Sequence, residues 1–376
     1  MITALRIFKE KQQNNGYINS ISHYLPPSQS SCILATGRSA INHLINKIDF
    51  SHKDSVLLPA YVAEGIIQPF IKSKIPIKFY KLDYNLFPDI TDISEILEKD
   101  ISIKLCVVIH PFGFEAPINP LLEILDKKKI LLLEDCAQGV FSRYEENNLP
   151  FGGKGNFALY SLNKFLPVLD GAILLSHVNK INVSLNQNEL TPINKKALDS
   201  YKKHLKNNRE IFLNDDQNET RELIKKSSKQ YDRYYEYISQ DSGNHKLCSY
   251  SEELMESFDC EKLILSRKRN MSLIYNNLSN NKIQLLYHKN NKIVPMVVPA
   301  RVFGGSRDKW IDKLSEKGVI LAQQSDRWNF LSMTKDIKKY SNEGDFIKNH
   351  VLIPINEFID EGKMCFMIES LNRMSL

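Results

Sequence analysis

The sequence lacks a long apolar run. No stretch reaches the roughly 18 apolar residues of a membrane-spanning helix, and the N-terminal MITALRIFKEKQQNNG lacks the apolar core of a signal peptide. None of the six cysteines belongs to a Cys-x-x-Cys pair, and the nine histidines show no zinc-ligand spacing. We therefore expect a cytoplasmic protein with reduced thiols, no metal site and no membrane contact.

A strong excess of one charge is also missing. The 50 Lys and Arg residues stand against 44 Asp and Glu residues, which indicates a mildly basic surface and no nucleic-acid partner. Two nucleotide-binding motifs are absent. There is no Gly-x-Gly-x-x-Gly, and Lys154 is followed by Gly155 where a P-loop has Ser or Thr. A nicotinamide dehydrogenase therefore fits poorly.

Between residues 31 and 176, apolar runs alternate with amphipathic stretches. Short runs rich in branched residues are typical of buried parallel strands. We expect strands at 32–35, 56–59, 77–82, 104–110, 129–135 and 157–162, with a further apolar strand at 171–176. The clearest helix is 91–99, where Asp92 and Glu95 form a capping box. This alternation predicts a doubly wound, mostly parallel α/β domain.

The remaining chain divides by composition. We expect an N-terminal arm (1–30), a large domain (31–248) that includes a polar, partly helical segment (177–248), and a long helix with a smaller α/β domain (249–376). The long helix should be capped by Ser249 and run past Arg269, followed by strands near 293–298 and 350–354 and helices near 306–317 and 360–373. In the polar segment, we interpret the stripe Tyr231, Tyr234, Tyr235 and Ile238 as a packing face.

Three short stretches carry candidate chemistry. In ATGRSAINHLI (35–45) a strand ends and a helix begins, so unpaired N–H groups and the helix dipole make a site for a phosphate. In LLLEDCAQGV (131–140) an acidic pair ends an apolar strand, at the edge where open parallel sheets bind ligands. A carboxylate there needs a cationic partner such as a protonated pyridine nitrogen, and Asp135 is our candidate.

The third stretch is ALYSLNKFLPVLDGAILLS (158–176). Ser161 and Lys164 follow an apolar strand, and apolar residues flank the lysine on both sides. Desolvation lowers the pKa of such an amine and makes it nucleophilic. A Schiff-base lysine with an acidic pyridine partner is typical of pyridoxal 5'-phosphate (PLP) sites.

The order of these stretches resembles fold-type-I PLP enzymes and, more closely, the DegT/StrS-type aminotransferases, which act on sugar nucleotides. The matching segments are TGRSAI (36–41), VLLPAYVAEGI (56–66), VVIHPFGFEAP (107–117), EDCAQ (134–138), SLNKFLPVLDGA (161–172), KLSEKGVILAQQ (313–324) and VLIPINEFIDE (351–361). The resemblance implies a phosphate turn at Gly37, Arg38 and Ser39, a pyridine partner at Asp135, a residue beside the ring at Gln138, a phosphate ligand at Ser161 and the Schiff-base lysine at Lys164. His110 falls in the family's His-x-x-Gly stretch and is interpreted as structural or supporting.

The sequence departs from the family pattern at three places. Ser161 precedes the lysine by three residues, where the common form has five, as in a branch with Ser-Leu-Arg-Lys. The aromatic residue that usually stacks on the cofactor ring would fall on Ala63, so Tyr61 is our candidate substitute. The Gly-Tyr-Asn-Tyr-Arg-Met segment that reaches the partner's site is missing, and the nearest stretch is 244–250.

The resemblance implies a homodimeric enzyme that moves an amino group from glutamate to a nucleotide-linked keto sugar, in surface-polysaccharide or secondary-metabolite biosynthesis. Relatives that deoxygenate sugars lack the lysine, so Lys164 favours transamination and is expected to act as acid and base. Two alternatives stay open: another PLP-dependent lyase or transfer reaction on an amino acid or amine, and a non-catalytic binding protein with this fold.

Overall fold

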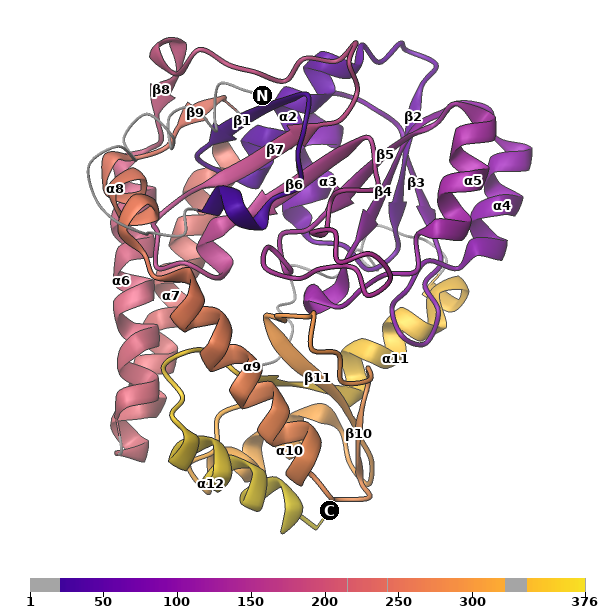
Figure 1. The fold of residues 1–376 in the computed structure, drawn as a ribbon. Coiled ribbons are helices and arrows are strands. Elements are labelled where there is room, and N and C mark those ends of the chain that lie inside the picture. Colours follow the sequence, from indigo (N-terminus) through magenta and orange to yellow (C-terminus); the bar gives the residue numbers. More distant parts are fainter. Residues whose placement is uncertain (1–20, 215, 242, 322–336, 376) are drawn as a thin grey trace.

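The computed structural model describes residues 21–214, 216–241, 243–321 and 337–375 (Figure 1). Most of the predicted N-terminal arm and the last residues of the 313–324 stretch lie outside the described residues. The division into domains at residues 30 and 248 stays a prediction.

A seven-stranded sheet organises the first half of the chain. Its order is β1-β7-β6-β5-β4-β2-β3. The strands are β1 (Ser30–Leu34), β2 (Ser55–Pro59), β3 (Ile77–Tyr80), β4 (Ile103–Ile109), β5 (Leu131–Asp135), β6 (Phe157–Ser161) and β7 (Ala172–Ser176). The pairs from β3 to β6 are parallel, whereas β7 runs antiparallel to both β6 and β1. The seven predicted strands are all present, and the doubly wound, mostly parallel sheet is confirmed.

Helices cover both faces of this sheet because its strands, apart from the edge strand β3, bury side chains on both sides. On one face, α2 (Gly37–Ile48) and α3 (Glu64–Lys72) pack apolar residues such as Ile41 and Phe70 against Leu133 and Leu159. On the other face, α4 (Ile90–Lys99) and α5 (Asn119–Lys128) pack against Leu132. Successive strand residues point to opposite faces. Two consecutive residues at the end of a strand therefore lie on opposite faces of the sheet, in different surroundings.

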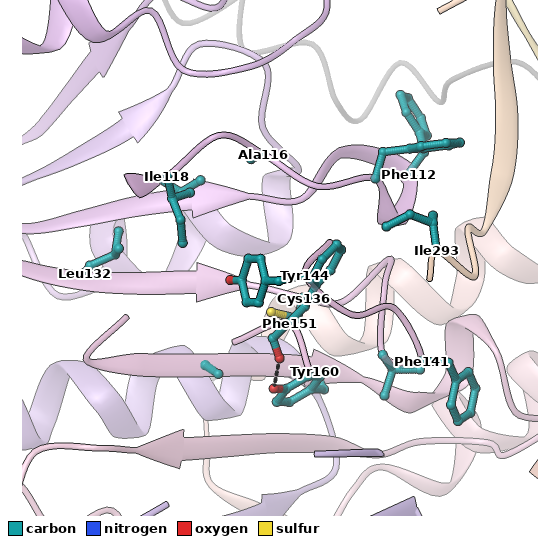
Figure 2. Close-up of a cluster of buried hydrophobic side chains, with 14 of the residues drawn as sticks. Phe112, Ala116, Ile118, Leu132, Cys136, Phe141, Tyr144, Phe151, Tyr160 and Ile293 are labelled. Atoms are coloured by element: carbon teal, nitrogen blue, oxygen red, sulfur yellow. Dashed lines mark hydrogen bonds between the residues drawn. The ribbon is translucent and has the colours of Figure 1, made fainter. Parts of the chain in front are cut away.

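The second face continues into an aromatic cluster beyond the strand ends (Figure 2). Tyr160 donates a hydrogen bond to the carbonyl of Phe151 at 2.5 Å, and Tyr144 packs beside Phe151 with ring centroids 5.0 Å apart. Ile293, from the C-terminal part of the chain, belongs to the same cluster. This cluster joins the large sheet to the C-terminal region.

Two long helices, α6 (Lys195–Leu213) and α7 (Gln217–Gln240), form an antiparallel hairpin within the polar middle segment (Figure 1). At one end the hairpin packs beside the sheet, where Tyr234 and Ile238 join Ala35 and Leu169 in a hydrophobic cluster. At the other end the carbonyl of Phe212 accepts a hydrogen bond from the Lys363 side chain at 2.8 Å. A short pair of parallel strands joins the chain just before the hairpin, β8 (Thr191–Pro192), to the chain just after it, β9 (His245–Lys246). Tyr231 and Tyr235 of the stripe pack against the same cluster, as expected for a packing face.

The C-terminal region contains a three-stranded antiparallel sheet covered by helices. The strands are β10 (Ile283–Leu285), β11 (Val297–Val302) and β12 (His350–Pro354). Helices α9 (Cys260–Asn277), α10 (Arg307–Ser315), α11 (Ser341–Asn349) and α12 (Glu361–Asn372) contact this sheet or its core. Helix α8 (Ser249–Ser257) instead buries Met255 in the core of the large sheet. Trp310 and Leu314 of α10 are fully buried against this sheet.

Two helix starts differ from the sequence-based prediction. The cap of α4 is Asp89, whose Oδ1 accepts from the backbone N–H groups of Thr91 and Asp92 at 3.0 and 3.1 Å. Asp92 is turned away instead and accepts from the backbone N–H of Lys81 at 2.8 Å. The predicted capping box was therefore wrong, because the helix begins earlier than expected. At α8 the cap position is Cys248 without a side-chain cap bond, and Ser249 is the first helical residue.

The long helix predicted from Ser249 is two helices. Phe258 has an extended backbone and ends α8, and Asp259 caps α9 by accepting from the N–H of Lys262 at 3.0 Å. The strand expected at 293–298 begins only at Val297. The residues before Val297 pack against the large-sheet core instead. Ile293 and Val294 are buried in that core, and the backbone N–H of Met296 donates to the carbonyl of Phe112.

Candidate active site

A cavity of about 270 Å³ lies at the carboxyl edge of the large sheet. The ends of β5 and β6, the N-terminus of α2 and the α6–α7 hairpin form its walls. Ligands in open α/β sheets bind at this edge. The structure brings five of the eight predicted site residues to this cavity, namely Gly37, Arg38, Asp135, Ser161 and Lys164.

Lys164 reaches the cavity from a tight turn after β6. The strand ends at Ser161 and one 3-10 turn, Leu162–Lys164, follows. Leu162 and Phe165 are buried on either side, so they fix the backbone while the partly buried lysine lines the cavity. Ser161 also lines it, and its hydroxyl donates to Asn163 Oδ1 at 2.9 Å.

The N-terminus of α2 forms the opposite side of the cavity. Thr36 caps the helix by accepting from the N–H of Ser39 at 3.1 Å. The first N–H groups of a helix have no carbonyl partner within it, so they present a positive end to the cavity. A side chain at Gly37 would meet Leu159 at an ordinary 3.9 Å, so packing inside the chain does not demand glycine there. A ligand that comes close to the backbone at position 37 would explain a glycine there.

Arg38 extends from the same helix end. Its Nε donates to Gln68 Oε1 at 3.0 Å, and its guanidinium lies 4.8 Å from the ring centre of Tyr235. Its Nη2 is buried and has no hydrogen-bond partner among the described residues. An unpaired, buried guanidinium nitrogen is costly, so this position favours an anion.

Asp135 is buried at the end of β5 and lines the same cavity. Its Oδ1 accepts from the backbone N–H of Ala137 at 2.9 Å. Burial raises the pKa of this carboxyl, and the positive charge of Lys164 acts in the opposite direction. A cationic ring nitrogen in the cavity would act in the same direction as Lys164 and favour the carboxylate.

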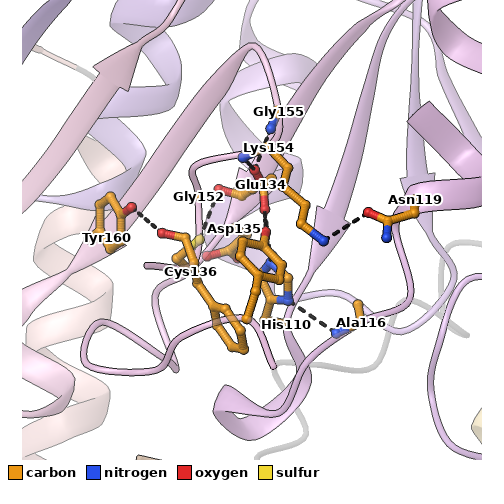
Figure 3. Close-up of polar contacts among 12 residues, drawn as sticks. His110, Ala116, Asn119, Glu134, Asp135, Cys136, Gly152, Lys154, Gly155 and Tyr160 are labelled. Atoms are coloured by element: carbon orange, nitrogen blue, oxygen red, sulfur yellow. Dashed lines mark hydrogen bonds and ion pairs between the residues drawn. The ribbon is translucent and has the colours of Figure 1, made fainter. Parts of the chain in front are cut away.

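Glu134, one residue earlier, belongs to a separate buried network on the other face of the sheet (Figure 3). His110 Nδ1 accepts from the N–H of Ala116 at 3.1 Å, so its Nε2–H donates to Glu134 at 3.0 Å. The hydroxyl of Tyr144 and the N–H of Gly155 also donate to this carboxylate. Burial alone would raise the pKa of Glu134, but these hydrogen bonds outweigh it and lower the pKa. Glu134 and His110 therefore position the strand end.

Three predicted site residues lie elsewhere. Ser39 is buried under the phosphate turn, and its hydroxyl donates to the carbonyl of Gly243 at 2.9 Å. Gln138 Oε1 accepts from the N–H of Phe112 at 2.5 Å, and Gln138 lines a separate void of about 10 Å³ together with Tyr61. Ala63, the position that lacks the usual aromatic residue, does line the cavity of Lys164. The cofactor roles of Ser39, Tyr61 and Gln138 stay predictions.

Sequence reasoning missed the side of the cavity that the helix hairpin supplies. These residues, here called the aromatic wall, are Tyr201, His204, Tyr231, Tyr234 and Tyr235. The stripe on α7 has helical spacing, and that signal is shared by packing faces and ligand-binding faces. The contact of α7 with the cavity depends on its pairing with α6, which no local pattern reveals.

A larger cleft of about 940 Å³ adjoins the cavity at Lys164. The exposed face of α6 lines it with Lys202, Lys203, Lys206 and Arg209. Its two acidic lining residues are Asp199 and Glu357, and Glu357 is paired with Arg267 at 3.3 Å. The cleft wall that faces solvent is therefore basic and suits an anionic ligand.

A model of the DegT/DnrJ/EryC1/StrS aminotransferase family matches residues 20–221, more than half of the chain. The chain belongs to this family. The predicted resemblance is thereby confirmed, and the protein is an aminotransferase-family enzyme that acts on small molecules. No helix in the described parts of this aminotransferase is long and apolar enough to cross a membrane.

Solved structures of aminotransferases share the fold at low identity. Spr1654 from Streptococcus pneumoniae, known in apo, PLP and PMP forms, is 14% identical with a TM-score of 0.68 for the apo form, over 99% of this chain and 95% of that one. The sugar aminotransferase CalS13 from Micromonospora echinospora is 15% identical with a TM-score of 0.65, over 98% and 96% of the two chains. An aminotransferase from Psychrobacter cryohalolentis is 12% identical with a TM-score of 0.64, over 98% and 94%. These likenesses confirm the predicted fold.

Proposed function

We propose that this aminotransferase carries PLP on Lys164 and transfers an amino group from glutamate to a nucleotide-linked keto sugar. The observation that carries the proposal is the meeting of Lys164, Asp135 and the N-terminus of α2 around one cavity. A homodimer in the cytoplasm and a role in surface-polysaccharide or secondary-metabolite biosynthesis are parts of the same proposal that stay predictions.

The residues around the cavity fit three of the polar groups of PLP, namely the phosphate, the ring nitrogen and the aldehyde. The buried, unpaired Nη2 of Arg38 and the first N–H groups of α2 suit the phosphate. The buried carboxyl of Asp135 suits the pyridine nitrogen, and Lys164 supplies the amine that bonds to the aldehyde. A site for a different anion would account for the unpaired Nη2 of Arg38. It would not account for the buried carboxyl of Asp135 in the same cavity as the Lys164 amine.

Each residue then has a defined task. When bound, PLP supplies an electron-withdrawing ring and a carbonyl carbon that accepts amines. Asp135 keeps a positive charge on the ring nitrogen, because its carboxylate is the nearby counter-ion. The Lys164 amine holds the cofactor at rest and carries the proton during amino transfer. Buried Leu162 and Phe165 hold the lysine backbone in place.

The basic cleft beside Lys164 supports a phosphate-bearing acceptor. Lys203, Lys206 and Arg209 line a space that continues from the cofactor cavity, and a nucleotide diphosphate carries matching negative charge. CalS13 is described as a sugar aminotransferase, which supports the same substrate class.

Spectroscopy of the purified protein tests the proposed function. The protein should be yellow, and glutamate should convert its absorption band to that of the amine form of the cofactor. A panel of nucleotide-linked keto sugars should then restore the original band and yield an amino sugar. Absence of any change with glutamate while another amino acid reacts would reject the donor. Restoration by simple keto acids alone would reject the acceptor.

We predict that the double substitution Lys203→Ala and Lys206→Ala raises KM for the nucleotide-linked acceptor by roughly five- to tenfold, because two positive charges leave the cleft. The half-reaction with glutamate should keep its rate. Steady-state kinetics at low and high salt measure the effect, which should shrink as salt screens the charges.

The matched control is Lys195→Ala with Lys196→Ala. These two exposed lysines lie on the same helix α6 but do not line the described cleft. Equal KM values for the two double variants would show that the cleft residues do not bind the acceptor.

A further inference from the structure

Every aromatic ring that lines the cofactor cavity in the described part of the chain comes from the α6–α7 hairpin. The cavity floor of Gly37, Asp135 and Lys164 is accompanied by small and aliphatic residues, including Ala63. The aromatic wall faces this floor. A heteroaromatic cofactor binds well against the face or edge of aromatic rings, and the cavity offers such rings on one side only among the described residues.

The rings of the aromatic wall hold one another in a layer. Tyr201 and Tyr234 are buried with ring centroids 4.6 Å apart. Tyr231 lies 4.7 Å from Tyr235 and 4.7 Å from His204. His204 is oriented by Ser227 Oγ at 2.8 Å from its Nδ1. These contacts make the layer continuous along the two helices.

Two contacts join the aromatic wall to the cofactor residues. The Tyr201 hydroxyl donates at 3.0 Å to the carbonyl of Asn163, the residue that precedes Lys164 in the sequence. The Tyr235 ring lies 4.8 Å from the Arg38 guanidinium, directly at the phosphate turn. If these rings only packed α6 against α7, neither the hydrogen bond to Asn163 nor the contact with the Arg38 guanidinium would be needed.

We propose that the aromatic wall is part of the cofactor site and supplies, from the same chain as Lys164, the aromatic surface that position 63 lacks. The proposal rests on PLP as the cofactor, which is part of the proposed function. It assigns a role to the polar middle segment, whose aromatic residues Tyr201, Tyr231, Tyr234 and Tyr235 meet at this cavity.

Titration of the apoprotein with pyridoxamine phosphate tests the aromatic wall. This amine form cannot bond covalently to Lys164, so its dissociation constant reports the non-covalent contacts alone. Tyr231→Leu should weaken binding about two- to tenfold, which is the usual loss for one aromatic contact. Tyr231→Phe keeps the ring and should bind within about twofold of the unmodified protein.

Tyr237→Leu is the matched control. Tyr237 lies on the same helix, is also partly buried and packs against the same hydrophobic cluster, yet it does not line the cavity. Equal dissociation constants for Tyr231→Leu and Tyr237→Leu would overturn the proposal. If Tyr231→Leu binds more weakly than Tyr237→Leu as expected, but the unmodified, cofactor-loaded protein aminates no nucleotide-linked keto sugar, only the acceptor class is rejected.

A measurement on the unmodified protein covers the case in which a variant does not fold. Tetranitromethane nitrates accessible tyrosines, and peptide mapping locates them. Saturating pyridoxamine phosphate should protect Tyr231 several-fold and leave Tyr237 unchanged. Equal nitration of Tyr231 with and without the cofactor would overturn the proposal independently of any substitution.

Discussion

Replacing Lys164 with alanine should abolish the covalent attachment of PLP and lower the rate of amino transfer by about 10³-fold or more. The amine is lost from the cavity that also contains Asp135 and the α2 N-terminus, and no other lysine lines that cavity in the described chain. Borohydride reduction followed by peptide mass mapping measures the attachment directly. In the unmodified protein the reduced cofactor should be found on Lys164.

Lys154→Ala is the control for this experiment. Lys154 is also largely buried, but its amine pairs with Glu146 at 2.6 Å and lies 4.0 Å from the Tyr144 ring centre, away from the cavity. This variant should keep the yellow colour. A reduced cofactor found on Lys154, or on any lysine other than Lys164, would contradict the assignment of the site.

Asp135→Asn should bind the cofactor but lose most turnover. Two opposite unit charges about 4 Å apart attract by about 4 kcal/mol at an effective dielectric constant of about 20, and a neutral amide would not supply this attraction to a bound ring nitrogen. We expect kcat to fall by about 10²- to 10³-fold with a smaller change in KM. Single-turnover kinetics with glutamate separate this effect from product release.

Glu134→Gln serves as the comparison for Asp135→Asn. It removes a buried carboxylate that is held by His110, Tyr144 and Gly155 on the opposite face of the sheet. The melting temperature should therefore fall while the turnover of the folded protein changes little. Near-normal turnover in Asp135→Asn would mean that Asp135 only accepts from the Ala137 N–H.

The large sheet was predictable because its strands are short apolar runs between helices. Seven buried strands correspond to seven such runs, and Lys164 and Asp135 lie at the strand ends where the pattern places them. Helix ends were less predictable, as at Asp89, because several neighbouring polar residues can cap and the choice depends on the preceding turn. The break at Phe258 carries no Gly or Pro, and the only local signal for it is the capping residue Asp259.

The position of a site residue was predictable where that residue follows a strand of the sheet, and the cofactor roles themselves stay predictions. Gln138 was placed beside the cofactor by resemblance, whereas its side chain accepts from the Phe112 backbone of another loop. Tyr61 likewise faces the small void near Phe112. The aromatic wall depends on how α6 and α7 pair and on where the hairpin meets the sheet. Contacts of this kind join residues far apart in the sequence, and periodicity within one helix does not encode them.

The two sides of the cavity are built from the sequence in different ways. The floor gathers residues scattered from Ala35 to Lys164 over several strands and a helix start, after which only β7 is needed to complete the large sheet. The wall comes from one contiguous segment, the α6–α7 hairpin, which begins after the last strand of that sheet. Every strand pairing of the large sheet is therefore made without the hairpin. A substitution on the wall side of the cavity leaves the register of the sheet that holds Asp135 and Lys164 unchanged.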